Sequence, residues 1–267
     1  MKRVFQVALC MVTCGLTFSQ SFADNFKIAS TSLCGDSYLL ALKLDQAAAL
    51  SWQSRDKISL ASPAQRELPQ VWDAAETLVA SDADIILYGP GEGVTSSKFA
   101  NLSGKNIISL KWGEDFKTVI DNAQALGAPN AFKIDLEQRL NALETHASVR
   151  QFKPKILYMS RSGATAGADT YVDAAIKAAG GQNLITSPGW QSRDPEFLLS
   201  LEPDLIVTSF FTDGYESVQA KSIRNRVLRG FLDRHPQLDI PGALWPCASP
   251  HLIDVAERIS KAIDSLP

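Results

Sequence analysis

Short apolar runs alternate along the chain with longer stretches in which apolar residues recur every three or four positions. Several short runs are apolar at every position, such as residues 85–87 and 205–207. Continuous apolar strands between helices are typical of parallel sheets that are covered on both sides, so the pattern predicts an α/β fold. The expected strands cover residues 27–30, 48–52, 84–88, 106–112, 155–159, 204–210 and 242–245.

Two helical stretches occupy the middle of the chain. The first covers residues 116–126 and ends at Gly127 and Pro129, which stop helices. The second carries one apolar stripe along about 20 residues, formed by Phe132, Leu136, Leu140, Leu143 and Ala147. Strands precede and follow it in about equal number, so we expect a long helix between two Rossmann-like lobes. An ordinary crossover helix within one sheet is the alternative.

The two halves resemble each other. Residues 76–87 can be laid over residues 196–207 with a constant offset, and Glu, Leu, Asp and Ile match at equivalent places. Each copy is predicted to be a helix that leads into a buried strand through a tight acidic turn. Two lobes built on one plan would explain this match, although coincidence remains open for a single short segment.

The first 23 residues have the pattern of a secretory signal. Lys2 and Arg3 precede an apolar stretch, and Ser21 and Ala23 supply the small residues that signal peptidase needs. A membrane anchor is the alternative, but the apolar run is shorter than the roughly 20 residues that a spanning helix needs. We therefore expect a periplasmic protein with a signal peptide (1–23), an N-terminal lobe (24–128), a linker helix (129–151) and a C-terminal lobe (152–267).

Charge and cysteine content narrow the choice of partners. The whole chain of 267 residues has a net charge of −3, and loss of Lys2 and Arg3 makes it more negative. This argues against nucleic acid, which binds a basic face. Of the four cysteines, Cys34 and Cys247 remain after cleavage. We weigh three states for this pair: a disulfide, which an oxidising compartment favours, two separate buried thiols, or contact with a ligand.

A ligand of an open parallel sheet binds beyond the carboxyl ends of its strands. Four of the five tryptophans fall at predicted strand ends or in the loops beyond them, and their flat rings suit an apolar or conjugated ligand. Each could instead cap a core. Arginines there could clamp carboxylates or phosphates, or lie solvated on the surface. The candidate ligand-binding residues are Cys34, Trp52, Arg55, Tyr88, Trp112, Arg161, Trp190, Phe210 and Trp245.

Several segments together resemble a known family. Residues 27–36 read KIASTSLCGD, residues 178–184 read AAGGQNL and residues 244–247 read LWPC. With the segments 75–87 and 196–207, they resemble class III periplasmic binding proteins of ABC importers, of the cobalamin, ferric-siderophore and haem type. Each segment alone is weakly specific, but their order and spacing together are more specific. The resemblance covers nearly the whole mature chain.

The resemblance implies two α/β lobes joined by one long helix, with the ligand between them and no catalysis. In this family, one acidic residue on each lobe binds a basic pocket of the membrane permease. The resemblance places Glu76 and Glu196 at these two positions. Two ordinary glutamates near helix N-termini are the alternative. It places Trp190 where some cobalamin-type members have a ligand-lining tryptophan. The expected partners are a metal-chelate, corrinoid or porphyrin-like ligand and an ABC permease, and we expect a monomer.

Competing functions receive less support from the sequence. Residues 89–93 read GPGEG but lack the ending of a phosphate-binding loop, and no nucleophile elbow is present. The histidines His146, His235 and His251 are scattered, so we expect no metal site, no resident cofactor and no enzyme. A secreted enzyme, or a sensor or scavenger of the same fold that is not coupled to transport, remains the alternative. The sequence does not decide which ligand is bound.

Overall fold

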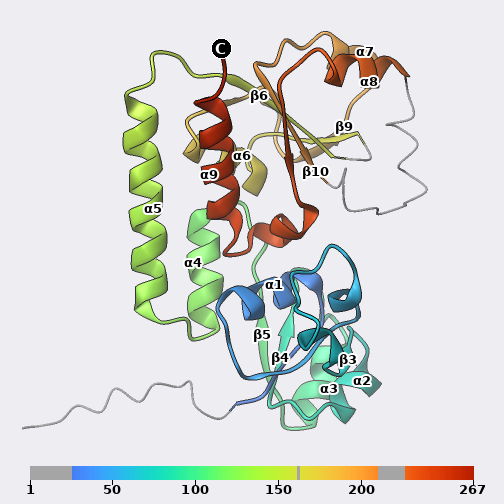
Figure 1. Cartoon of the computed structure of the whole chain (residues 1–267). Helices are drawn as coiled ribbons and strands as arrows, with labels where there is room; N and C mark the ends of the chain where they lie inside the picture. The colour runs from blue at the N-terminus through green and yellow to red at the C-terminus, as the bar shows by residue number, and fades with distance from the viewer. Residues whose placement is uncertain (1–25, 161–162, 210–225) are drawn as a thin grey trace, which may run out of the picture.

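A computed structural model of the chain describes residues 26–160, 163–209 and 226–267. Its main sheets are parallel and lie in two lobes, shown one above the other in Figure 1. The predicted α/β fold with two lobes is therefore confirmed. Among the described residues, helix length and apolar content nowhere reach what a membrane-crossing segment requires.

The sheet of the N-terminal lobe has the strand order β3-β2-β1-β4-β5. Successive strand residues point to opposite faces, so Ile28 and Leu87 enter one apolar cluster with α1 and α4, whereas Ile86 enters another with α2 and α3. Helices thus cover both faces. The elements are β1 (Ile28–Ser30), α1 (Leu33–Ala41), β2 (Ala47–Ser51), η1 (Trp52–Arg55), η2 (Gln65–Glu67), β3 (Gln70–Val71), α2 (Ala75–Ala80), β4 (Ile85–Tyr88), α3 (Ser96–Leu102), β5 (Asn106–Ser109) and α4 (Phe116–Ala125).

The sheet of the C-terminal lobe has the order β11-β10-β6-β8, and β7 and β9 form a small antiparallel pair. Its two faces are again covered, by α5, α6 and α9 on one side and by α7 and α8 on the other. The elements are α5 (Asn130–Ser148), β6 (Lys155–Ser160), β7 (Ala164–Ala166), α6 (Tyr171–Ala178), β8 (Gln182–Asn183), β9 (Trp190–Ser192), α7 (Pro195–Leu199), β10 (Leu205–Ser209), α8 (Arg226–Leu232), β11 (Gln237–Ile240), η4 (Gly242–Leu244), η5 (Pro246–Ala248) and α9 (Leu252–Ile263).

One strand prediction is wrong. Residues 242–245 were expected to form the last strand, but they form the 3-10 turn η4 and Trp245 after it. The last strand is β11, which ends at Ile240. Its side chains alternate between buried and exposed positions because it is an edge strand, so it lacks the continuous apolar run that marks the central strands.

Both central helices pack against the two lobes. In α4, Phe116 and Val119 belong to the core of the C-terminal lobe, whereas Ala123 and Leu126 belong to a core of the N-terminal lobe. In α5, Phe132 packs against both cores. The predicted stripe of α5 is present, and the connection between the lobes involves α4 as well as α5.

Ion pairs fasten α5 to α9. The Arg139 guanidinium donates to both carboxylate oxygens of Glu257 at 2.7 Å and to Asp254 at 2.6 Å. Near the end of α5, Arg150 donates to Asp264 at 2.8 Å. Because paired, two-point hydrogen bonds fix both the distance and the angle between the groups, α5 is held as part of the C-terminal lobe.

The sequence repeat has a counterpart in three dimensions. The Asp84 carboxylate accepts a hydrogen bond from the backbone N–H of Lys27 at 2.9 Å, and its own N–H donates to the Lys27 carbonyl at 2.8 Å. Asp204 makes the same pair of bonds with Lys155, at 2.6 and 2.8 Å. In both lobes the aspartate therefore aligns a helix-to-strand turn with the start of the neighbouring strand.

Candidate functional site

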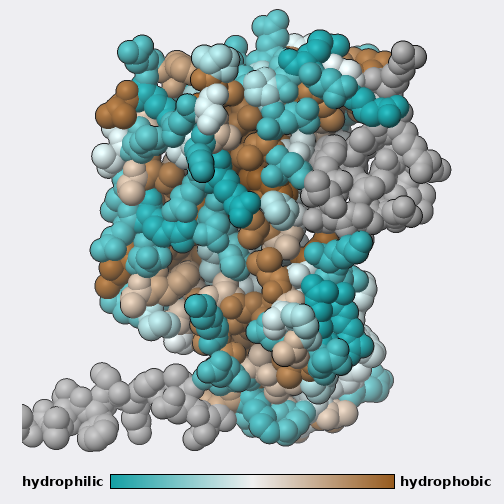
Figure 2. Space-filling view, in the orientation of Figure 1, coloured by the Kyte–Doolittle hydropathy of each residue, from teal (hydrophilic) through white to brown (hydrophobic). Residues whose placement is uncertain are grey.

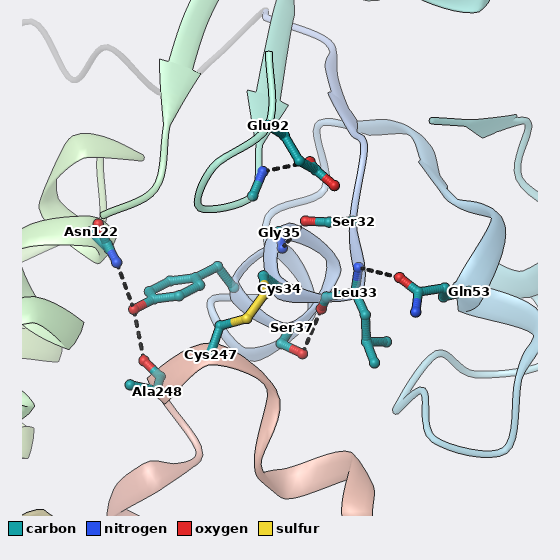
Figure 3. The surroundings of a disulfide bond; sticks show 12 residues. Ser32, Leu33, Cys34, Gly35, Ser37, Gln53, Glu92, Asn122, Cys247 and Ala248 are labelled. Carbon is teal, nitrogen blue, oxygen red and sulfur yellow. Dashed lines mark hydrogen bonds between the residues drawn. A yellow bond between two sulfur atoms is a disulfide. The ribbon is translucent and has the colours of Figure 1, made fainter. Parts of the chain in front are cut away.

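The carboxyl edges of the two sheets meet at one covalent contact. Cys34 lies in the first turn of α1, directly beyond β1, and Cys247 lies in η5, beyond β11. A disulfide joins them, with their Cα atoms 5.4 Å apart (Figure 3). Of the three states considered for these cysteines, the structure has the disulfide. The segment that follows β1 in one lobe is thus joined to the segment that follows β11 in the other.

Two tryptophans follow neighbouring strands at the carboxyl end of the N-terminal sheet, which we call the rim of this lobe. Strands β2 and β3 pair in register, with Ser51 opposite Val71, and Trp52 and Trp72 are the residues that directly follow this pair. Both are about half exposed, at 54% and 46%. The rim therefore carries two large, half-exposed apolar side chains.

Trp72 was not among the predicted site residues. The strand before it, β3, has only two residues, which are too few to show any periodicity. From the sequence, Trp72 was therefore assigned only as a residue that precedes a helix. An exposed tryptophan directly before the acidic start of α2 was the only available signal.

Trp112 follows β5 at the other side of the same rim. It is 69% exposed, and its ring lies close to Gly91 in the loop after β4. A side chain on Gly91 would stand 3.7 Å from that ring, and the backbone there has a φ of +82°, which favours glycine. In the space-filling view, apolar side chains are visible on the face where the two lobes meet (Figure 2).

An aromatic cluster forms the corresponding part of the C-terminal lobe. Trp190 is the first residue of β9 and pairs with Ala166 of β7. The Trp190 indole is half exposed. Its ring centroid is 5.8 Å from that of Tyr158, edge-on, and 5.4 Å from that of Tyr171. Such edge-to-face contacts fix a ring in place, so one face of Trp190 is supported while the rest is available to a ligand.

Two predicted site residues are buried instead. Tyr88 has no exposed surface, because it points to the face of the sheet that α2 and α3 cover, and its hydroxyl is 2.9 Å from that of Ser96. Trp245 is 2% exposed and packs edge-on against Tyr158, with ring centroids 5.3 Å apart. We therefore correct both assignments: these two side chains support the rims from below and do not line them.

The predicted arginine contacts are only partly placed. Arg55 is exposed at the end of η1, and its Nε donates to the Arg66 carbonyl at 3.0 Å. Its guanidinium is thus held on the side of η1 and η2. Arg161 and Phe210 lie outside the described residues.

Glu76 and Glu196 occupy equivalent places in the two lobes. Each is exposed in the first turn of a short helix, α2 or α7, eight residues before Asp84 or Asp204. Those aspartates make the matching backbone bonds described above, so the two glutamates are carried on the same local scaffold.

The described residues offer no metal centre. In that part of the chain, no group of three or more His, Cys, Asp or Glu side chains is placed to hold a metal ion. His146 lies 2.8 Å from Asp264, His251 lies 3.0 Å from Asp254, and the His235 ring lies 3.0 Å from the Pro203 carbonyl. Each histidine therefore has a local structural partner.

A groove of about 640 Å³ lies at the opposite edge of the N-terminal sheet. Its wall includes Ile28, Ile85 and Asn106, which are the first residues of β1, β4 and β5. It is therefore at the amino ends of the strands, away from the tryptophan rim, and it is not the ligand site that parallel sheets place at their carboxyl ends.

A buried carboxyl group lies one turn into α1, beside the rim. Asp36 has no exposed surface and accepts hydrogen bonds from the Ser51 backbone N–H at 3.0 Å and from its hydroxyl at 2.6 Å. Burial disfavours the charged form and raises the pKa of Asp36 to about 6, although the Ser51 hydrogen bonds lower it in part.

The Asp36 side chain should make stability decrease as pH rises. A carboxyl with a raised pKa in the folded state binds a proton more readily there than in the unfolded chain, so stability is lost between the unfolded pKa near 4 and the folded pKa near 6. In Asp36→Asn this dependence is absent. From pH 4.5 to 7.5, we expect the free energy of unfolding of Asp36→Asn to gain about 2 kcal/mol relative to wild type. Urea denaturation at both pH values measures this. An unchanged difference between the two proteins would mean that Asp36 is not buried as a titrating acid.

Comparisons with known proteins agree on the fold. No protein-family model matches the sequence. A curated cobalamin-binding protein of Halobacterium salinarum is 24% identical over 150 residues, which cover 52% of this chain and 41% of that protein. The match thus spans well under half the length of that relative.

Solved structures match over nearly the whole chain. A periplasmic heme-binding protein of Pseudomonas aeruginosa superposes with a TM-score of 0.70 at 22% identity, covering 90% of this chain and 94% of the other. The periplasmic heme-binding protein HutB of Vibrio cholerae gives 0.71 at 18% identity, over 89% and 98%. The vitamin B12-binding protein BtuF of the same organism gives 0.66 at 17%, over 90% and 96%.

The chain has the periplasmic binding protein fold. In this fold, the tryptophan rim of one lobe and the aromatic cluster of the other lie at the carboxyl edges of the two sheets, where the disulfide connects the lobes.

Proposed function

We propose that this protein is the periplasmic solute-binding component of an ABC importer. The observation that carries the proposal is the set of exposed tryptophans in two lobes that a disulfide joins: Trp52, Trp72 and Trp112 in one lobe and Trp190 in the other. The structures with the same fold are named as periplasmic heme- and vitamin B12-binding proteins, which supports the same role here.

The proposed ligand is a flat or bulky metal chelate: a corrinoid, a porphyrin or an iron–siderophore complex. Exposed indole rings bury large apolar area against a conjugated ligand without needing a change of backbone shape. A cleft that is formed before binding lowers the cost of ordering side chains. The protein performs no reaction on the ligand in this proposal and holds no resident cofactor.

The proposal includes the secretion route and the partner. Residues 1–23 are removed as a signal peptide, residues 24–128 and 152–267 act as the two lobes, and residues 129–151 link them. Glu76 and Glu196 dock onto basic groups of the membrane permease, one from each lobe. Their equivalent scaffolds support this role, because a partner with two equivalent surfaces could bind both.

Binding of coloured ligands tests the function. Protein isolated from its native periplasm should carry an absorbance band of a metal chelate, and the purified protein should bind cobalamin, haemin or a ferric siderophore at a ratio of one to one. In the same titration, Trp190→Ala should weaken the affinity about tenfold or more, because about 2 kcal/mol of apolar contact is lost.

Phe99→Ala is the matched control for Trp190→Ala. Phe99 is equally exposed, at 49%, but lies on α3, and its removal should leave the dissociation constant unchanged. Absence of a coloured ligand from the native protein, together with no binding of any of the three ligand classes, would reject the proposed function.

A further inference from the structure

A second connection joins the lobes, apart from the chain that runs through α4 and α5. The Cys34–Cys247 disulfide links residues 213 positions apart in the sequence, one in each lobe. Both cysteines are partly exposed, so a small dithiol can reach them. We call this region the inter-lobe joint and define it by Cys34, Tyr38, Gly113, Cys247 and Ala248.

A hydrogen bond reinforces the joint one helical turn beyond the disulfide. Residues four apart lie on the same face of a helix, and Tyr38 therefore faces the same segment of the C-terminal lobe as Cys34. Its buried hydroxyl donates to the Ala248 carbonyl at 2.9 Å and accepts from the Asn122 amide at 3.2 Å. Figure 3 shows Asn122 and Ala248 on opposite sides of this hydroxyl.

The two lobes also approach each other at the level of the backbone. A Cβ atom added to Gly113, between β5 and α4, would stand 2.3 Å from the Ala248 Cβ and 2.9 Å from the Cys247 carbonyl oxygen. Only glycine fits at such a distance. The segment around Cys247 is thus held against the N-terminal lobe by a disulfide, a hydrogen bond and close packing.

The backbone of this segment is strained. Cys247 and Ala248 have φ values of 52° and 46°, in the left-handed region that residues with a Cβ rarely adopt. Two adjacent residues of this kind persist only where their surroundings hold them in place. Loss of the disulfide removes the one covalent restraint, so the segment gains a way to relax into a common conformation and leave the N-terminal lobe.

We propose that the Cys34–Cys247 disulfide is a redox latch that holds the lobes in their ligand-binding orientation. A dithiol supplies two electrons and two protons, becomes a disulfide itself, and leaves two thiols at Cys34 and Cys247. The joint then loosens and the carboxyl edges are no longer fixed opposite each other. Reduction thereby lowers the affinity for the ligand; this last effect rests on the proposed binding function, whereas the loosening does not.

Hydrogen exchange of the ligand-free protein tests the latch directly. After reduction with dithiothreitol, amides of residues 31–42 and 242–250 should exchange at least tenfold faster under native conditions, while the strands β6 and β10 keep their protection. The Cys34→Ala/Cys247→Ala protein should show the same pattern without reductant. Dithiothreitol should have no further effect on that variant, which controls for the reagent.

Two further measurements separate the latch from simple stabilisation. Tyr38→Phe, with the disulfide intact, should raise exchange at residues 247–250 less than reduction does. A disulfide that only stabilises the folded state would lower the unfolding midpoint and leave native exchange at the joint unchanged, and that result overturns the proposal. Titration of oxidised and reduced protein with whichever of cobalamin, haemin and a ferric siderophore binds should give dissociation constants at least fivefold apart. Equal affinities with a faster-exchanging joint would overturn the effect on binding, whereas no binding by either form would reject the proposed function alone.

Discussion

Replacement of both Glu76 and Glu196 with alanine should reduce ligand uptake by cells about tenfold or more, while the purified protein keeps its ligand affinity. Both side chains are exposed on short helices, and neither is among the residues proposed to contact the ligand, so we expect the ligand affinity to be unchanged. Truncating one partner of an ion pair that becomes buried in an interface costs several kcal/mol, because the other charge is left unpaired. Transport of labelled ligand at limiting concentration, beside titration of the purified variant, measures the two effects.

The control variant makes the same change of charge at two other exposed glutamates. Glu144 on α5 and Glu202 before β10 are also exposed, and Glu144→Ala/Glu202→Ala should transport normally. Each single variant of the docking pair should have an intermediate effect, since one lobe would still be anchored. Normal uptake by Glu76→Ala/Glu196→Ala would refute the docking role and leave the binding proposal intact.

The central strands could be predicted from sequence because both of their faces are buried. Residues 85–87 and 205–207 are apolar without interruption, and β4 and β10 begin and end within a residue or two of the expected bounds. The edge strands β3 and β11 could not, although the edge strand β5 was predicted. β3 has two residues, and β11 alternates buried and exposed side chains while carrying Gln237 and Asp239. In such strands pairing to a neighbour, and not the local pattern, decides the conformation.

Burial divides the predicted site residues into exposed and buried side chains. Trp52, Trp112 and Trp190 are exposed, so they are accessible to a ligand, and their part in binding stays a prediction. Whether a strand-end side chain faces the rim or the core depends on the alternation of faces, and a shift of one residue reverses it. Tyr88 is the last residue of β4 and faces α2 and α3, whereas Trp72 is one residue beyond β3 and lies free.

The joint between the lobes was beyond the reach of sequence reasoning. Two cysteines that are far apart in the sequence allow a disulfide, a pair of thiols or a ligand contact, and no local pattern chooses among them. The deciding facts are three-dimensional: Tyr38 reaches Ala248, and Gly113 admits that segment against β5 and α4. The shared role of α4 was hidden for the same reason, since an amphipathic pattern shows which face is apolar but not which lobe covers it.

Trp245→Ala should destabilise the protein by about 3–5 kcal/mol, because it removes a large side chain from a packed core and leaves a cavity. The indole is 2% exposed and contacts Tyr158 edge-on, with Tyr171 also in contact. Its Nε1 has no hydrogen-bond partner among the described residues, so the loss is one of packing and aromatic contact. Urea denaturation of the oxidised protein gives the change in the free energy of unfolding.

Two variants bracket the result. Trp245→Phe keeps an aromatic ring in the core and removes the unpartnered N–H, so its cost should stay below about 2 kcal/mol. Trp112→Ala deletes an equal side chain that is 69% exposed, and it should change stability by no more than about 0.5 kcal/mol. Ligand affinity shows whether Trp245 packs in the core or contacts the ligand. Trp245 packs against Tyr158, which also contacts Trp190, so Trp245→Phe should bind the ligand nearly as well as wild type. A Trp245→Ala protein with normal stability but no ligand binding would return Trp245 to the binding surface and contradict its place in the core.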